Sequence, residues 1–137
     1  MLAGSSVFCF SQNEKSSAIM SQQYKKILDD AKLLITFQRE SITEYQNIVT
    51  EINACLQKTK NSLEEMKKVI LPGQKATATS RYATIETYQQ QAEMNAVGLN
   101  DVLQKKEFNL LKFREYLKNL HGAVEKAEKE HLRLKGN

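Results

Sequence analysis

The sequence predicts an all-α fold in which two long helices form an antiparallel coiled-coil hairpin. Its composition is typical of long helices and unfavourable for turn-rich sheets: among 137 residues there are one Pro, five Gly and no Trp, with 41% apolar and 26% charged residues. Apolar residues recur every seven positions in both halves, and one strong turn signal lies near the middle of the chain. A chain of this length has room for one domain.

Residues 1–15 are expected to form an N-terminal tail. This stretch has no basic residue before its last position, so it makes a weak signal or transit peptide. Met1 and Met20 are both candidate starts, because the pattern that follows Met20 is sufficient for the fold on its own. The two cysteines, Cys9 and Cys55, are too few for a disulfide framework, and we expect a reduced, cytoplasmic location.

The first helix is expected over residues 17–71, where a seven-residue apolar repeat runs without a polar interruption. Such a repeat occupies the a positions of a heptad and implies a left-handed supercoil. Pro72 and Gly73 end this helix and Thr79 or Ser80 can cap the next, so residues 72–79 are predicted to form the turn. The a positions are Leu28, Ile35, Ile42, Val49, Leu56, Leu63 and Ile70.

The second helix is expected over residues 80–134, and residues 16–137 then make a single hairpin domain. Gly98 lies inside this helix, and Asp101 with Gln104 resembles a capping box. The sequence therefore leaves two forms open, a continuous helix and one that kinks or breaks near Gly98 to give a three-helix arrangement. The a positions of this half are Leu103, Leu110, Leu117 and Val124.

Charges beside the seam support an intrachain hairpin with a defined register. The e positions are basic or amide on the first helix and mostly acidic on the second, and folding at the turn brings opposite signs together. Lys106 is a misfit, because it occupies a core position opposite Val49. Either this polar residue fixes the register, or a third helix supplies an acidic partner. The facing pairs are Lys67 with Glu86, Lys60 with Glu93, Asn53 with Asn100, and Lys25 with Glu128.

An apolar flank beside the hairpin seam is expected to be buried against further helices. The g positions are largely apolar, which widens the stripe to the face of a multi-helix bundle, and further apolar residues lie on the outer face. The hairpin is therefore predicted to join partner coiled-coil chains, with a hetero-oligomer favoured over a homodimer. Two alternatives are that single exposed apolar residues are ordinary and that the tail covers them. The predicted interface is Ile27, Leu33, Leu34, Phe37, Ile48, Val69, Tyr88, Val102, Phe108, Leu111 and Tyr116.

Basic residues follow one side of the second helix and suggest an acidic partner. An acidic tubulin surface, an anionic membrane or nucleic acid could be attracted, although there is no dense patch for specific nucleic-acid binding. The alternative is a solvated face balanced by neighbouring glutamates. The stripe consists of Lys105, Lys112, Lys118, Lys126 and Arg133.

The sequence indicates no catalytic, cofactor or metal site, because it has no Gly-rich loop, nucleophile elbow or metal-ligand cluster. His121 and His131 fall on different helix faces and are expected at the edge and at the end of the core. We therefore expect a non-catalytic structural subunit of a hetero-oligomeric assembly, first of all a cytoskeletal or mitotic-spindle complex that contacts microtubules. A subunit of a vesicle- or organelle-tethering complex is the alternative, and a secretion chaperone or lipid-surface helical protein is a third.

Overall fold

In a computed structural model the chain is all-helical, which confirms the predicted fold class. The structure describes residues 2–36, 42–69 and 76–136, and within these ranges it contains helices and no strand. The helices are α1 (Leu2–Thr36), α2 (Ile42–Val69), α3 (Ala76–Gln104) and α4 (Leu110–Gly136).

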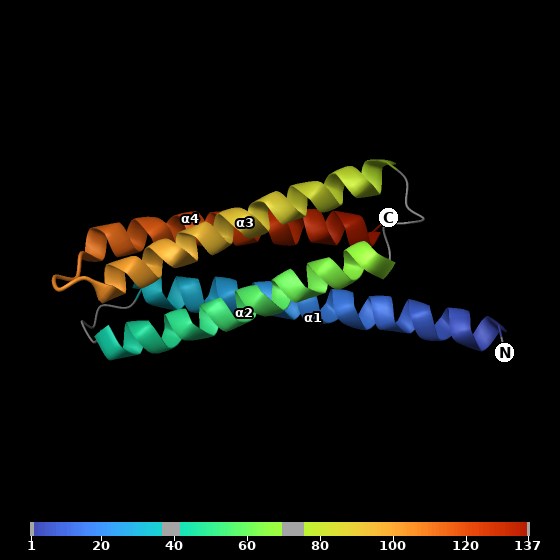
Figure 1. Cartoon of the computed structure of the whole chain (residues 1–137), viewed down its shortest axis with the longest axis horizontal. Coiled ribbons are helices and arrows are strands. Elements are labelled where there is room, and N and C mark those ends of the chain that lie inside the picture. Colours follow the sequence, from blue (N-terminus) through green and yellow to red (C-terminus); the bar gives the residue numbers. More distant parts are fainter. Residues whose placement is uncertain (1, 37–41, 70–75, 137) are drawn as a thin grey trace.

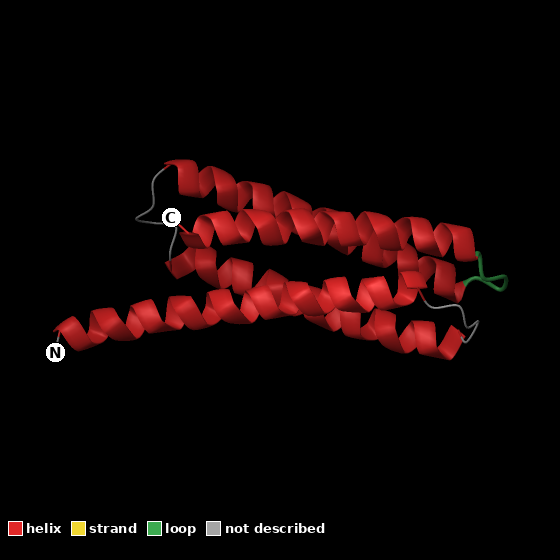
Figure 2. Ribbon diagram, turned by 180° about the vertical axis from the view of Figure 1, so that it is seen from behind, coloured by secondary structure: helices red, strands yellow, loops and turns green. Residues whose placement is uncertain are grey.

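The four helices form an antiparallel bundle in which each helix packs against two others. α1 lies against α2 and α4, and α3 lies against α2 and α4 (Figure 1). Successive helices run in opposite directions, which is the up-down-up-down arrangement of a four-helix bundle. The end of α1, the start of α2 and the loop between α3 and α4 therefore share one end of the bundle (Figure 2).

The two long rods expected from the heptads are replaced by four shorter helices. One contact shows this directly: Lys26 Nζ lies 3.2 Å from Glu51 Oε2, joining α1 to α2. In a single straight helix these residues would be about 38 Å apart at the standard rise of ~1.5 Å per residue. The N-terminal tail predicted for residues 1–15 is instead part of a helix, since α1 begins at Leu2.

Local signals account for both breaks in the predicted rods. At the start of α4, Asn109 is the N-cap: its Oδ1 accepts a hydrogen bond from the backbone N of Lys112 at 3.1 Å. Before α2, Ser41 is followed three residues later by Glu44, the sequence pattern of a capping box. Ser41 itself lies outside the described residues. The second break thus falls at residues 105–109 and not near Gly98.

The predicted register survives this rearrangement where α2 faces α3. Asn53 Nδ2 donates a hydrogen bond to Asn100 Oδ1 at 3.3 Å, which confirms that predicted pair. Between α1 and α4, Ser21 Oγ lies 3.4 Å from His131 Nδ1, at nearly the same symmetric position about the turn. The bundle therefore keeps the helix partners of the predicted hairpin, α2 with α3 and α1 with α4, and adds two new contacts, α1 with α2 and α3 with α4. The other predicted pairs, Lys67 with Glu86, Lys60 with Glu93 and Lys25 with Glu128, form no ion pair among the described residues.

A small set of buried polar groups ties α2 to α3. The Gln89 amide Nε2 donates to the Leu56 carbonyl at 2.9 Å, and the Thr59 hydroxyl donates to Gln89 Oε1 at 3.0 Å. The Tyr82 hydroxyl donates to the Leu63 carbonyl at 2.6 Å. Because buried polar groups are costly when unpaired, these bonds favour one alignment of the two helices. The largest fully buried side chains of the core as a whole are Tyr24, Tyr45, Phe113, Met20, Ile27, Leu34, Ile52, Ile85, Leu99, Leu117, Leu120 and His131.

Gly98 permits a close approach between α3 and α4. A Cβ at this position would lie 2.5 Å from Cε1 of the Tyr116 ring, closer than two carbon atoms can come. Gly98 is thus explained by packing rather than by a kink, and α3 continues through it to Gln104.

We expect Gly98→Ala to destabilise the bundle by about 1 to 3 kcal/mol, since the Tyr116 ring must move and the core is overpacked. Gly122→Ala is the matched control, because a Cβ there meets nothing within 4 Å. That variant should gain about 0.5 to 1 kcal/mol from helix propensity. Urea unfolding followed by circular dichroism measures both, and equal effects of the two substitutions would contradict the assigned role of Gly98.

Cysteines placed at Lys26 and Glu51 should be joined within one chain by a short bismaleimide. The background carries Cys9→Ser and Cys55→Ala, and the expected link reports the packing of α1 on α2. The control places cysteines at Lys58 and Lys118, which are exposed on helices at opposite corners of the bundle and should not be linked. A product found only between chains, measured by mass spectrometry after digestion, would instead indicate extended rods.

Candidate functional site

Most of the predicted partner interface is covered by the chain itself. Ile27, Leu34 and Val102 are buried in the core. A further four side chains, at Ile48, Tyr88, Phe108 and Tyr116, are partly buried and pack against that core. Folding α1 onto α2 and α3 onto α4 turns the apolar flank inward, so one chain supplies the four helices that the sequence analysis assigned to several chains. Phe37 and the side chain of Val69 lie outside the described residues.

The exposed remainder of the predicted interface lies at one end of the bundle. Leu111, in the first turn of α4, is 79% exposed, and Leu33, near the end of α1, is 48% exposed. Ile42, which opens α2 and which the heptad placed in the core, is 42% exposed at the same end. We call this region the loop end and define it by its exposed apolar and basic residues: Leu33, Ile42, Lys105, Lys106, Leu111 and Lys112.

An aromatic cluster holds the loop between α3 and α4 against α2. The Phe108 ring stacks on Tyr45 with centroids 5.5 Å apart, and both rings lie 5.3 Å from the Phe113 ring. Such ring pairs stabilise a structure beyond their buried area. Phe108 is therefore an internal anchor of the loop and not the free interface residue that was predicted, whereas its neighbour Leu111 remains exposed.

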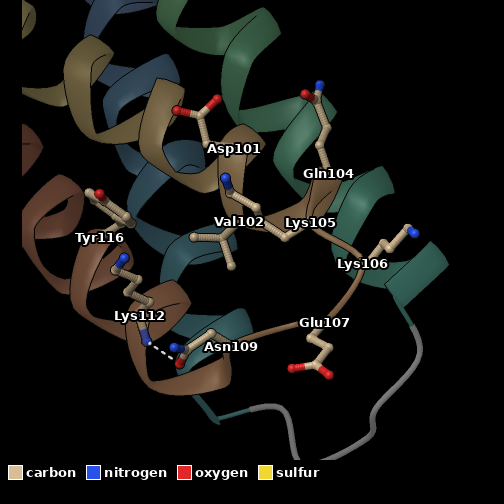
Figure 3. Close-up of a pocket in the computed structure, with 9 residues that line it drawn as sticks. All are labelled: Asp101, Val102, Gln104, Lys105, Lys106, Glu107, Asn109, Lys112 and Tyr116. Atoms are coloured by element: carbon tan, nitrogen blue, oxygen red, sulfur yellow. Dashed lines mark hydrogen bonds between the residues drawn. The ribbon is translucent and has the colours of Figure 1, made fainter.

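A cavity of about 830 Å³ opens beside this loop. Lys105 and Lys112 line it together with Val102 and Tyr116, and Figure 3 shows Val102 between the two lysines. Acidic residues contribute as well, since Asp101 is also part of the lining, as is Glu107. With Lys106 included, three ammonium groups and two carboxylates surround the opening, which leaves a net positive charge.

The lysines of the loop end differ from the basic residues farther along α4. Lys105, Lys106 and Lys112 are exposed and form no ion pair within the described part of the chain. In the C-terminal half of α4, Arg133 pairs with Glu130, and Lys126 lies 5.8 Å from the centre of the Tyr88 ring. The predicted stripe also includes Lys118, which is exposed midway along α4. Among the described residues, Arg133 is thus the one member of the predicted stripe that pairs with a carboxylate, and Lys105 and Lys112 are its two members at the loop end.

Lys106 does not occupy the core position that the hairpin register predicted for it. The residue lies in the loop, exposed to solvent, while Val49 is buried in the core. The open question of an acidic partner from a third helix therefore disappears, because Lys106 does not occupy a core layer.

The outward side of α3 is a second unusual surface, and sequence reasoning missed it. Met94 is 74% exposed and Val97 is 58% exposed. Over residues 79–104, where the burial of α3 is described, ten residues are exposed, and Asp101 is the single charged one among them. We call the central part of this surface the α3 face: Thr87, Gln90, Met94 and Val97. The sequence signal for it is that no basic residue occurs from Tyr82 to Gln104.

The two histidines and Cys55, the side chains most suited to catalysis or metal binding, occupy structural positions. His131 is fully buried with its ring 6.0 Å from that of Tyr24, and His121 is a partly exposed residue 3.8 Å from Glu125, so both histidines lie where predicted. Burial raises the pKa of the Cys55 thiol, which disfavours a reactive thiolate. Among the residues that the structure describes, no group of three or more His, Cys, Asp or Glu is placed to hold a metal ion.

No helix in the described ranges combines the length and the apolar character needed to cross a membrane. Comparisons with protein-family models, with curated proteins and with solved structures find no match for this chain. Function is therefore inferred from the two exposed surfaces alone.

Two aspartate substitutions distinguish the buried residues of the predicted interface from the exposed ones. Leu34→Asp places a charge in the core and should unfold the bundle at a cost of at least about 4 kcal/mol. Leu111→Asp should leave the unfolding free energy within about 0.5 kcal/mol of the wild type, because the side chain faces water. Helicity and urea midpoints by circular dichroism measure both. A fully folded Leu34→Asp chain would mean that this flank is not internal.

Proposed function

We propose that this chain is a non-catalytic structural subunit that carries a partner protein in a hetero-oligomeric assembly. Support comes from the distribution of its residues: the buried Thr59, Gln89 and Tyr82 side chains bond within the bundle, whereas five of the exposed large apolar residues lie on two surfaces, the loop end and the α3 face. The bundle covers its own inner apolar faces, so the partner is added to a folded module and does not complete the core.

The exposure of Met94 and Val97 on a nearly uncharged helix side is the observation that carries this proposal. The two residues are three positions apart and therefore neighbours on one side of α3. Charged residues are depleted at the centres of protein interfaces, while Met and other large side chains are enriched. A partner helix that lies along α3 would cover this apolar pair, and Asp101, one turn beyond Val97, is the exposed charge that it would meet.

The setting that we propose is a cytoskeletal or spindle assembly, with a vesicle- or organelle-tethering complex as the alternative. The lysines of the loop end favour an acidic surface, and the microtubule is one such surface. Co-sedimentation with microtubules that weakens as salt is raised would support the first setting. Its absence under low salt would favour the alternative.

Substitution of both α3-face apolar residues by glutamate should release the partner. We expect Met94→Glu with Val97→Glu to lower the recovery of a stoichiometric partner chain on the tagged protein at least tenfold, because two charges would have to be desolvated. The matched control is Ala54→Glu with Gln57→Glu, which adds the same charges at the same spacing on the exposed side of α2.

Two outcomes would contradict the proposal. Equal recovery of the partner by both double variants would remove the case for the α3 face. A purified wild-type chain that is dimeric by light scattering, and monomeric after the two α3-face substitutions, would assign this face to a second copy of the chain.

A further inference from the structure

We infer that the loop end docks end-on against an anionic lipid bilayer, with Leu111, Leu33 and Ile42 entering the headgroup region and Lys105, Lys106 and Lys112 contacting acidic headgroups. This contact does not depend on the partner proposed for the α3 face, and it assigns the loop-end lysines to a lipid surface in place of a microtubule. The loop end closes one end of the bundle, whereas the α3 face lies along its side, so the two surfaces can be occupied at the same time (Figure 1).

The apolar part of this contact comes from three different helices. Leu33 is near the end of α1, Ile42 opens α2 and Leu111 belongs to the first turn of α4. Each is substantially exposed, although the chain buries the other apolar residues of its heptads at neighbouring positions. Exposed apolar side chains that gather at one place on a folded module mark an interaction surface.

The basic part of the contact surrounds the most exposed apolar residue. Lys112 follows Leu111 directly, and Lys105 and Lys106 lie in the loop that leads into α4. All three ammonium groups lack an intrachain carboxylate partner in the described part of the chain, so binding an anion costs no existing ion pair. Basic residues close to a membrane are attracted by its acidic lipids, and nearby leucines add buried apolar area.

The acidic residues of the same region reduce this attraction without cancelling it. Asp101 and Glu107 line the cavity beside the lysines. Figure 3 shows the Glu107 carboxylate pointing away from Lys112, whereas Asp101 lies on the same side of Val102 as the Lys105 ammonium group. Three ammonium groups against two carboxylates give a net attraction that is modest, so measurable binding requires the apolar residues as well.

The shape of the surface favours a bilayer over a partner helix. A partner helix needs a line of contacts along one helix, which the α3 face supplies with Met94 and Val97. The loop end instead presents side chains from separate helix ends, and such an arrangement suits a broad, flat surface. The Tyr45, Phe108 and Phe113 rings hold the loop in place, so Leu111 is presented without a large ordering cost.

Vesicle co-sedimentation of the purified full chain tests this inference. We expect binding to phosphatidylcholine vesicles that contain 30% phosphatidylserine, weaker binding as salt is raised, and at least tenfold weaker binding to pure phosphatidylcholine. Leu111→Asp should lose at least tenfold in affinity. Its control is Leu132→Asp, an exposed leucine toward the other end of α4, which should bind as the wild type does.

Two triple variants test whether binding requires the positive charge of the loop end. Reversal of Lys105, Lys106 and Lys112 to glutamate should abolish binding to the acidic vesicles. The same reversal at Lys58, Lys67 and Lys68, which are exposed on the half of α2 farther from the loop end, should reduce it much less. Helicity is checked for every variant so that unfolding is not mistaken for lost binding.

Three results would overturn the inference: no binding of the wild type to acidic vesicles, equal binding to neutral and acidic vesicles, or unchanged binding by Leu111→Asp. Co-sedimentation with microtubules through the same lysines, without vesicle binding, would assign the loop end to an acidic protein. None of these results bears on the α3 face, since Met94→Glu with Val97→Glu is measured by partner recovery.

Discussion

The structure depends on the reversal of the chain within each half, because that reversal brings the apolar flank of every helix inside. A straight hairpin would leave Ile27, Leu34 and Val102 on its surface, and the bundle buries all three. At the reversal between α3 and α4, the Asn109 cap starts the new helix and the stacked rings of Tyr45 and Phe108 fasten the loop to α2. The same reversal leaves Leu111 and the loop lysines exposed at the end of the bundle.

The helical class and the register of α2 on α3 could be predicted because they follow from periodicity and charge. The reversals could not be found in this way, since the seven-residue spacing passes from Ile35 to Ile42 as though the helix continued. No Gly or Pro lies between these two residues, and the weak signal was the capping pattern of Ser41 and Glu44. At Gly98 the error was the reverse, because a break was considered there and the helix continues. In a sequence, a glycine that makes room for a neighbouring ring cannot be told from a glycine at a kink.

The candidate surfaces were predictable in part for a related reason. Leu33, Leu111, Lys105 and Lys112 were recognised because they fall outside the a, d and g positions of the heptad, so their exposure does not depend on how many helices the chain forms. Lys106 was instead placed in the core, because it falls at a d position. Met94 and Val97 also fall outside the core positions, but an isolated apolar pair carries little signal. Their significance comes from the neighbouring uncharged positions on α3, and only the folded helix brings these together on one side.

The two proposed contacts are close enough to influence one another. Val97 is seven residues before Gln104, so the α3 face begins about 10 Å from the loop end at a rise of ~1.5 Å per residue. A partner helix is itself about 10 Å wide, and one that lies along α3 would reach the surface on which the loop end rests. Asp101 lies between the two regions and would repel an acidic lipid surface, whereas a basic partner would neutralise it. A basic partner on α3 should therefore strengthen the membrane contact, and an acidic one should weaken it.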